Sequence, residues 1–111
     1  MKISNLILYG VFMNYYEGLN PDERDQVKYS LTNLIEDPWS VLSFISQPDD
    51  YPELFEIRWE VKENQFIHLL AFYTRSLAWV IATGTCSADG KIASAKYDEA
   101  MEIRKFYLDT F

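Results

Sequence analysis

The longest apolar stretch of the chain runs from Phe66 to Thr83 and contains two segments joined by the polar turn Thr74-Arg75-Ser76. Both segments are rich in aromatic, β-branched and aliphatic residues, and neither alternates cleanly between apolar and polar positions. Continuous apolar runs of this length, interrupted by a turn, are typical of central strands that are covered on both faces. The pattern therefore predicts a hairpin at the centre of the fold, with the rest of the chain covering it.

The residues just before this stretch alternate between apolar and polar positions, which is typical of a half-buried strand. The two faces of the strand predicted there carry Phe55, Ile57, Trp59 and Val61 on one side and Leu54, Glu56, Arg58 and Glu60 on the other. The polar segment from Lys62 to Gln65, centred on Glu63-Asn64, predicts a turn into the hairpin. These segments together predict three consecutive antiparallel strands.

The N-terminal part of the chain predicts a strand followed by helices. Ile3 to Val11 is mostly apolar and predicts the first strand. Phe12 to Leu19 is ambiguous, because its apolar residues have helical spacing and Gly18 would end one or two turns.

The clearest helix signal begins at Asn20, a suitable N-cap that is followed by Pro21 and, three residues after the cap, by Glu23. Pro38 predicts the end of this helix. Its apolar stripe is Val27, Leu31, Leu34 and Ile35. Trp39 to Ile45 is interpreted as either a short apolar helix or a docked loop.

The C-terminal part predicts a loop and a last helix. Gly84 to Gly90 is small and polar, which predicts a mobile loop, and Ser94 to Asp109 predicts a helix. The apolar stripe of this helix is Tyr97, Ala100, Met101, Arg104 (through its aliphatic stem) and Leu108. The order β-α-α-β-β-β-α over residues 1–111 predicts a single α+β domain, in which an N-terminal helical hairpin and a C-terminal helix pack on an antiparallel meander.

Composition excludes several classes of protein. The chain is 49% apolar and 16% aromatic, which is ample for a packed core, and its uncharged runs, such as Phe66 to Tyr73, are too short to span a bilayer. The start of the chain lacks the cleavage site of a signal peptide. The single cysteine, Cys86, excludes an internal disulfide and fits a reducing cytoplasm.

Charge carries further information, because 10 Lys and Arg stand against 17 Asp and Glu, for a net charge of −7. A protein that binds nucleic acid over a broad surface is expected to be basic. The acidity therefore indicates either ordinary solubility or attraction to a positively charged partner.

Six short patterns follow one another along nearly the whole chain. They are Asn20-Pro21-Asp22-Glu23-Arg24, Glu36-Asp37-Pro38, Leu54-Phe55-Glu56-Ile57-Arg58, Phe66-Ile67-His68-Leu69, Val80 to Gly84, and Ala100 to Tyr107. In this order they resemble the RelE/ParE superfamily of bacterial toxins and, within it, the phage-derived HigB-like branch. The resemblance implies a RelE-like fold, an endoribonuclease that acts on messenger RNA at the ribosome, and an antitoxin protein as partner.

Three residues would carry the chemistry that the resemblance implies. Arg58 would bind phosphate, His68 would act as base or acid, and Lys91 would supply a cation from the loop. Each residue also has a structural interpretation. His68 shares its face with Phe66 and other apolar residues and would be a satisfied core histidine. Arg58 would form a surface ion pair with the glutamates on its own face, and Lys91 would be ordinary surface.

The loop after Gly84 departs from the family pattern. Ser87 and Ala88 stand where the family commonly has a pair of lysines, and of the basic residues only Lys91 remains. This departure favours an alternative function, that of a non-catalytic, phage-encoded inhibitor that binds a basic, nucleic-acid-handling host protein. The acidic residues that would bind such a partner are Asp49, Asp50, Glu53, Glu56, Glu60 and Glu63. No metal-ligand spacing and no phosphate-binding glycine motif is present, so the sequence predicts neither a metal nor a cofactor.

Overall fold

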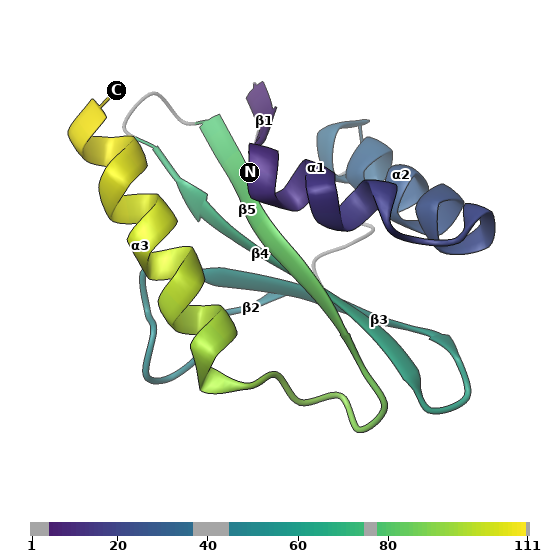
Figure 1. The fold of residues 1–111 in the computed structure, drawn as a ribbon. Coiled ribbons are helices and arrows are strands. Elements are labelled where there is room, and N and C mark those ends of the chain that lie inside the picture. The colour runs from purple at the N-terminus through teal and green to yellow at the C-terminus, as the bar shows by residue number, and fades with distance from the viewer. Residues whose placement is uncertain (1–4, 37–44, 75–77, 111) are drawn as a thin grey trace.

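A computed structural model describes residues 5–36, 45–74 and 78–110 of the chain (Figure 1). These ranges leave out all but Ile45 of the segment Trp39 to Ile45, which was interpreted as a helix or docked loop, together with Arg75-Ser76 of the predicted turn and the helix end predicted at Pro38. The elements in chain order are β1 (Asn5–Leu8), α1 (Gly10–Glu17), α2 (Pro21–Glu36), β2 (Ile45–Ser46), β3 (Phe55–Lys62), β4 (Gln65–Tyr73), β5 (Ala78–Ser87) and α3 (Ser94–Thr110).

The predicted meander is confirmed and forms the middle of a five-stranded sheet with the order β1-β5-β4-β3-β2. Strands β3, β4 and β5 pair antiparallel, and the turn at Glu63-Asn64 places Asn64 at a φ of 59°. Two short strands form the edges of the sheet: β1, whose parallel pairing was not predicted, and β2, which was not predicted as a strand. Strand β1 pairs parallel with β5, and β2 pairs antiparallel with β3. Both strands of the predicted hairpin are therefore interior, which explains why their apolar runs are continuous.

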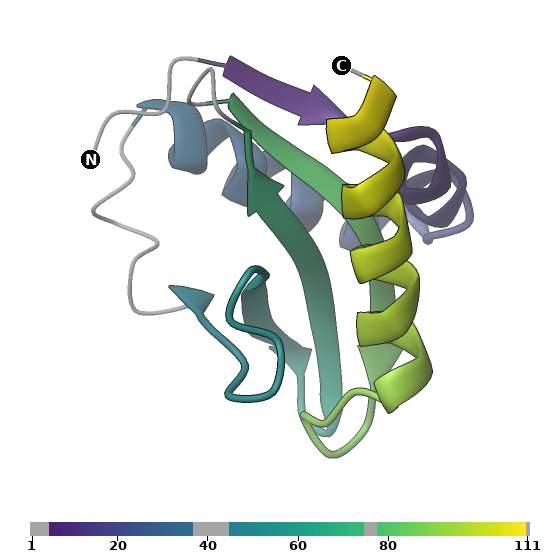
Figure 2. The same ribbon diagram turned by 90° about the vertical axis from the view of Figure 1, so that its left-hand side faces the viewer.

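Helices cover both faces of this sheet. Residues of α1 and α2 pack against one face, where the buried core includes Phe12, Val27, Leu31, Leu34, Ile57, Ile67, Leu69, Trp79 and Ile81. Helix α3 packs against the other face, with a core of Leu54, Leu70, Phe72, Val80, Ala82, Ala100 and Ile103. Figure 1 shows α1 and α2 lying together and away from α3, and Figure 2 shows α3 running along β5. No helix among the described residues is long and apolar enough to cross a membrane.

The first strand is shorter than predicted, since it ends at Leu8 rather than at Val11. The Tyr9 N–H still donates to the Ile81 carbonyl at 3.1 Å, but the Tyr9 carbonyl accepts from the Met13 N–H at 2.9 Å. The chain therefore leaves the sheet at Tyr9 and enters α1 at once. The ambiguous segment after it is this helix.

The capping signal at Asn20 is confirmed in detail. The Asn20 side-chain Oδ1 accepts a hydrogen bond from the Glu23 N–H at 2.8 Å, and Glu23 Oε1 accepts one from the Asn20 N–H at 3.3 Å. This reciprocal pair satisfies two N–H groups that α2 would otherwise leave free. Three residues of the predicted stripe are buried, but Ile35 is 48% exposed, so its inclusion in the stripe was wrong.

We expect Asn20→Ala to lower the free energy of unfolding by about 1 kcal/mol, because alanine cannot accept the Glu23 N–H. Urea denaturation measures the change. Asn14→Ala is the matched control, because Asn14 is exposed on α1 and alanine has the higher helix propensity. Equal losses in the two variants would show that the cap contributes nothing to stability.

The predicted mobile loop from Gly84 to Gly90 was wrong over its first half. Strand β5 continues to Ser87, and residues 84–87 pair with residues 66–69 of β4. Gly84 marks a close approach between elements rather than a loop, because a Cβ there would lie 2.3 Å from the ring of Tyr15 in α1. Only the segment between Ser87 and Ser94 connects β5 to α3. This extension of β5 brings Ser87 beside β4.

Candidate active site

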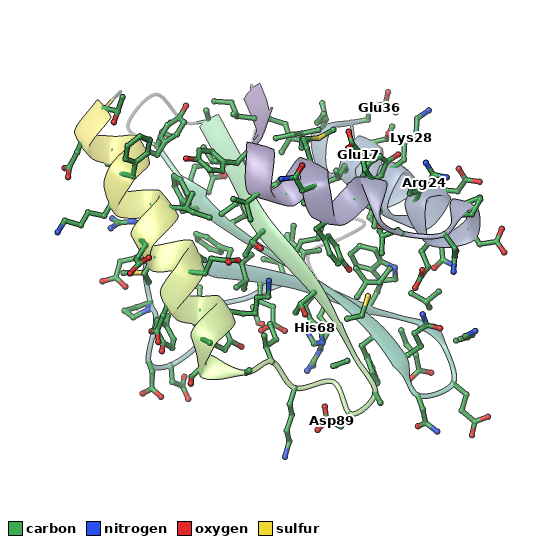
Figure 3. The ribbon with its side chains drawn as sticks, in the orientation of Figure 1. Glu17, Arg24, Lys28, Glu36, His68 and Asp89 are labelled. Atoms are coloured by element: carbon green, nitrogen blue, oxygen red, sulfur yellow. The ribbon has the colours of Figure 1, made fainter. Side chains whose placement is uncertain are left out.

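His68 lies in the central strand β4 and is 0% exposed. In the strand register it is opposite Arg58 on β3 and Thr85 on β5. Figure 3 shows His68 close to the end of the sheet where the loop with Asp89 lies, far from Arg24 and Lys28 on α2. The sequence therefore located His68 correctly within the apolar core, but the ring is not isolated there.

Both nitrogens of the His68 ring have partners. Nδ1 lies 3.2 Å from Glu56 Oε2, and Nε2 lies 2.7 Å from Ser87 Oγ. An ionised carboxylate only accepts hydrogen bonds, so Nδ1 carries the proton that is donated to Glu56. In the neutral ring Nε2 is then an acceptor, and the Ser87 hydroxyl donates to it.

Glu56, the partner of His68 Nδ1 in this hydrogen-bond network of Glu56, His68 and Ser87, is 6% exposed. Its Oε1 accepts a hydrogen bond from the Tyr97 hydroxyl at 2.7 Å. Burial acts to raise the pKa of Glu56, but hydrogen bonds from His68 and Tyr97, with the positive charge of Arg58, lower the pKa below its usual range. The glutamate is therefore a buried, ionised member of the network. The strand pattern had wrongly placed it on a solvated face.

Tyr97 belongs to α3 and connects the network to the loop before β3. Burial and the hydrogen bond to Glu56 raise the pKa of Tyr97, so its hydroxyl stays protonated and donates. Its ring stacks on that of Tyr51, with centroids 4.8 Å apart and planes 14° apart, and the Tyr51 hydroxyl donates to Asp98 Oδ1 at 3.0 Å. Helix α3 thereby fixes the position of the Glu56 carboxylate.

Arg58 has a partner that the sequence did not predict. Its guanidinium donates to the Gly90 carbonyl at 2.9 Å, and it forms no salt bridge with a carboxylate among the described residues. The Gly90 N–H in turn donates to Ser87 Oγ at 3.1 Å. Gly90 is buried and has a φ of 77°, a left-handed conformation that glycine adopts without strain. The expected ion pair with Glu56 or Glu60 is therefore not formed.

Two of the three residues predicted to carry the chemistry are connected to Gly90 by hydrogen bonds, and the third is its neighbour in the chain. Arg58 binds its carbonyl, and His68 reaches its N–H through Ser87. Lys91 follows it in the chain and is exposed, with its backbone N–H held by Asp89 Oδ1 at 3.0 Å. The result is an imidazole and a guanidinium at one end of the sheet, next to a loop that carries an exposed lysine.

The six acidic residues predicted to bind a partner do not form one surface. Glu56 is buried in the network, and the other five are exposed. Asp49, Asp50 and Glu53 precede β3, whereas Glu60 and Glu63 lie at its far end. A strand of eight residues spans roughly 25 Å, so the exposed acids form two separate groups.

Two residues of the network were not among the predicted site residues. Ser87 was noted only as a replacement for a lysine, and Tyr97 only as part of an apolar stripe. Neither has a local signal, because each is brought to the site by pairing or packing between distant segments. Among the described residues, no group of three His, Cys, Asp or Glu side chains could hold a metal ion.

Comparison with known proteins gives a fold but no match in sequence. No protein-family model matches the chain, and no curated protein matches it. Among solved structures, the chain is similar to a free Escherichia coli RelE toxin with two arginines replaced by alanine, with a TM-score of 0.63, 16% identity, and coverage of 92% of this chain and 97% of that one. It is also similar to the isolated E. coli RelE toxin in a P21 crystal form, with a TM-score of 0.55, 12% identity, and coverage of 89% and 97%. The chain therefore has a RelE-like α+β fold over nearly its full length.

Proposed function

We propose that this protein is a RelE-type toxin of a toxin–antitoxin pair and that it cleaves messenger RNA at the ribosome. The observation that carries the proposal is the connection of Arg58 and, through Ser87, of His68 to Gly90, which Lys91 follows in the chain. The RelE-like fold and the family resemblance of the sequence support the same function. The HigB-like, phage-derived branch remains a prediction from the sequence.

The groups around Gly90 match the needs of RNA cleavage by the 2′-hydroxyl. The reaction needs a base for the 2′-hydroxyl proton, cations for the charge that develops on phosphorus, and an acid for the leaving oxygen. His68 is the group that takes the proton, and because it is buried the proton reaches it through the Ser87 hydroxyl, which lies 2.7 Å from Nε2. Arg58 keeps guanidinium donors beyond the one bound to Gly90, and these with the Lys91 ammonium can bind a phosphate.

Expression of the chain in bacteria, with growth and transcript cleavage as readouts, tests this function. We expect the wild-type protein to arrest growth, and Lys91→Ala to lower the cleavage rate about 10²-fold, since it removes one cation from the developing phosphorane. Lys62→Ala is the matched control, because Lys62 is an exposed lysine at the far end of β3. A folded and abundant wild-type protein that neither arrests growth nor cleaves RNA would refute the proposal.

An antitoxin is the partner that this function requires, and one apolar groove supports it. The groove lies between β1, α1 and α2 and is lined by Leu6, Leu8, Phe12, Met13, Tyr16, Lys28, Leu31, Thr32 and Ile35. Leu8 is 41% exposed and Ile35 is 48% exposed, so they offer contacts to an apolar antitoxin segment, and Lys28 offers a charge to an acidic residue beside it. We expect Ile35→Ser, but not Tyr29→Ser at the more exposed position on the same helix, to reduce co-purification with the antitoxin.

A non-catalytic inhibitor of a basic host protein is the second candidate. The observation in its favour is the group of exposed acids Asp49, Asp50 and Glu53, which precede β3 and lie in the segment whose Tyr51 binds Asp98 of α3. Together they can attract a positively charged surface. Reversing these three charges should abolish capture of the host protein, and reversing Glu60 and Glu63 should not. Capture that is unchanged by the first reversal would exclude this function.

A further inference from the structure

His68 cannot itself touch a substrate, because its side chain is 0% exposed and both ring nitrogens are occupied. Ser87, the last residue of β5, lies on the Nε2 side of the ring and is partly exposed. We propose that Ser87 is the catalytic residue of this site, that its hydroxyl meets the RNA, and that His68 and Glu56 are positioning residues that act through it. This inference rests on the proposed function.

Four hydrogen bonds align the hydroxyl for proton transfer. The Tyr97 hydroxyl and His68 Nδ1–H both donate to Glu56, which leaves Nε2 as an acceptor 2.7 Å from Ser87 Oγ. The Gly90 N–H donates to the same Ser87 oxygen at 3.1 Å. When the hydroxyl proton moves to Nε2, Gly90 stabilises the negative charge on Oγ and Glu56 stabilises the imidazolium.

The sequence of proton transfers balances without a cofactor. Ser87 passes its proton to His68 Nε2 and takes the proton of the 2′-hydroxyl. The 2′-oxygen then forms a bond to phosphorus, and the bond from phosphorus to the 5′-oxygen breaks. The leaving 5′-oxygen takes a proton from the Lys91 ammonium. His68 afterwards returns its proton to solvent through Ser87, and Lys91 regains one from solvent.

A purely structural role for Ser87 is the competing explanation. The Gly90 N–H bond to Ser87 Oγ alone would fix the loop after β5, as serine hydroxyls often do in turns. Such a role needs only an acceptor oxygen. It does not require that the hydroxyl proton can move to His68.

A phosphonylating probe separates the two roles without any RNA. A fluorophosphonate reacts with a serine when Oγ bonds to phosphorus, fluoride leaves and the hydroxyl proton moves to a base, which is the same proton transfer to His68. We expect the folded wild-type protein to be labelled at Ser87 at least about 100-fold faster than at Ser94, an exposed serine at the start of α3. His68→Gln should lower the labelling rate of Ser87 about 10²-fold or more, and Ser87→Ala should remove it. Melting temperatures establish that each variant is folded. Glu56→Gln, which keeps the size of the side chain but removes the charge that stabilises the imidazolium, should also lower the labelling rate of Ser87.

RNA cleavage by the same proteins then distinguishes failure of this inference from failure of the proposed function. Ser87→Ala should lower the cleavage rate about 10²-fold, and Ser87→Thr, which restores a hydroxyl, should recover part of it. Labelling of Ser87 no faster than of Ser94 would overturn the inference whatever the RNA result. Cleavage that is unchanged in Ser87→Ala would also overturn it while leaving the function intact. Fast labelling without RNA cleavage by the wild-type protein would instead refute the proposed function and retain the activated serine.

Discussion

Replacing Glu56 by alanine is expected to lower the free energy of unfolding by about 3–5 kcal/mol. The carboxylate accepts hydrogen bonds from two side chains, His68 of β4 and Tyr97 of α3. Truncation would leave both donors without their acceptor and would leave a cavity in place of a carboxylate that is 6% exposed. Urea denaturation followed by tryptophan fluorescence measures the change.

Glu60→Ala is the matched control for this prediction. Glu60 lies on the same strand and the same face as Glu56, but its side chain is exposed. Its loss should change the free energy of unfolding by no more than about 0.5 kcal/mol. Similar losses in the two variants would mean that the buried network does not stabilise the fold.

The effect of Glu56 should also depend on pH in a defined direction. The pKa of Glu56 is lowered in the folded protein, so its ionised form stabilises the fold at any pH above the pKa of an unfolded glutamate. This contribution is lost as the pH falls through the lowered pKa of the folded state. The difference in stability between wild type and Glu56→Ala should therefore be largest near neutral pH and shrink in acid. A difference that grows as the pH falls would contradict the assignment of an ionised Glu56.

Gly84→Ala should destabilise the fold by about 1–3 kcal/mol through overpacking. The added Cβ would lie 2.3 Å from Cδ1 and Cε1 of the Tyr15 ring and 3.1 Å from Cδ2 of Leu69. The Tyr15 ring cannot simply rotate away, because it packs in the core between α1 and the sheet and its hydroxyl is hydrogen-bonded to Cys86 Sγ at 3.1 Å. Relief therefore requires a shift of α1 relative to β5.

Two further variants identify the source of this strain. Gly10→Ala should be nearly neutral, because a Cβ at Gly10 would meet no atom within 4 Å. In a background of Tyr15→Ala, the added methyl at Gly84 should cost much less than in the wild type, since the clashing ring is gone. An equal cost in both backgrounds would mean that the strain has a source other than Tyr15.

Local signals in the sequence were sufficient for much of this fold. The capping box at Asn20 depends on hydrogen bonds within one turn of chain, and the alternation in β3 depends on successive side chains pointing to opposite faces. Both features depend only on residues that are close in the sequence, and both were predicted correctly, as were the meander and the last helix. The same alternation placed Arg58 and Glu56 on one face, but it could not tell that the first is exposed and the second buried beneath α3.

Contacts between distant segments decided the rest. Gly84 was taken for the start of a loop, because the sequence cannot show that the ring of Tyr15 occupies the space of its missing side chain. Ser87 reaches His68 only because β5 continues past that glycine in register with β4, and a shift of one residue would turn its side chain to the other face. The sequence by itself thus determined the meander, the helices α2 and α3 and the order of these elements, and it supplied Arg58, His68 and Lys91 as candidates. The tertiary structure alone decided that Glu56 and Ser87 hold the two sides of the histidine ring, since strand register and helix packing join residues that no local pattern connects.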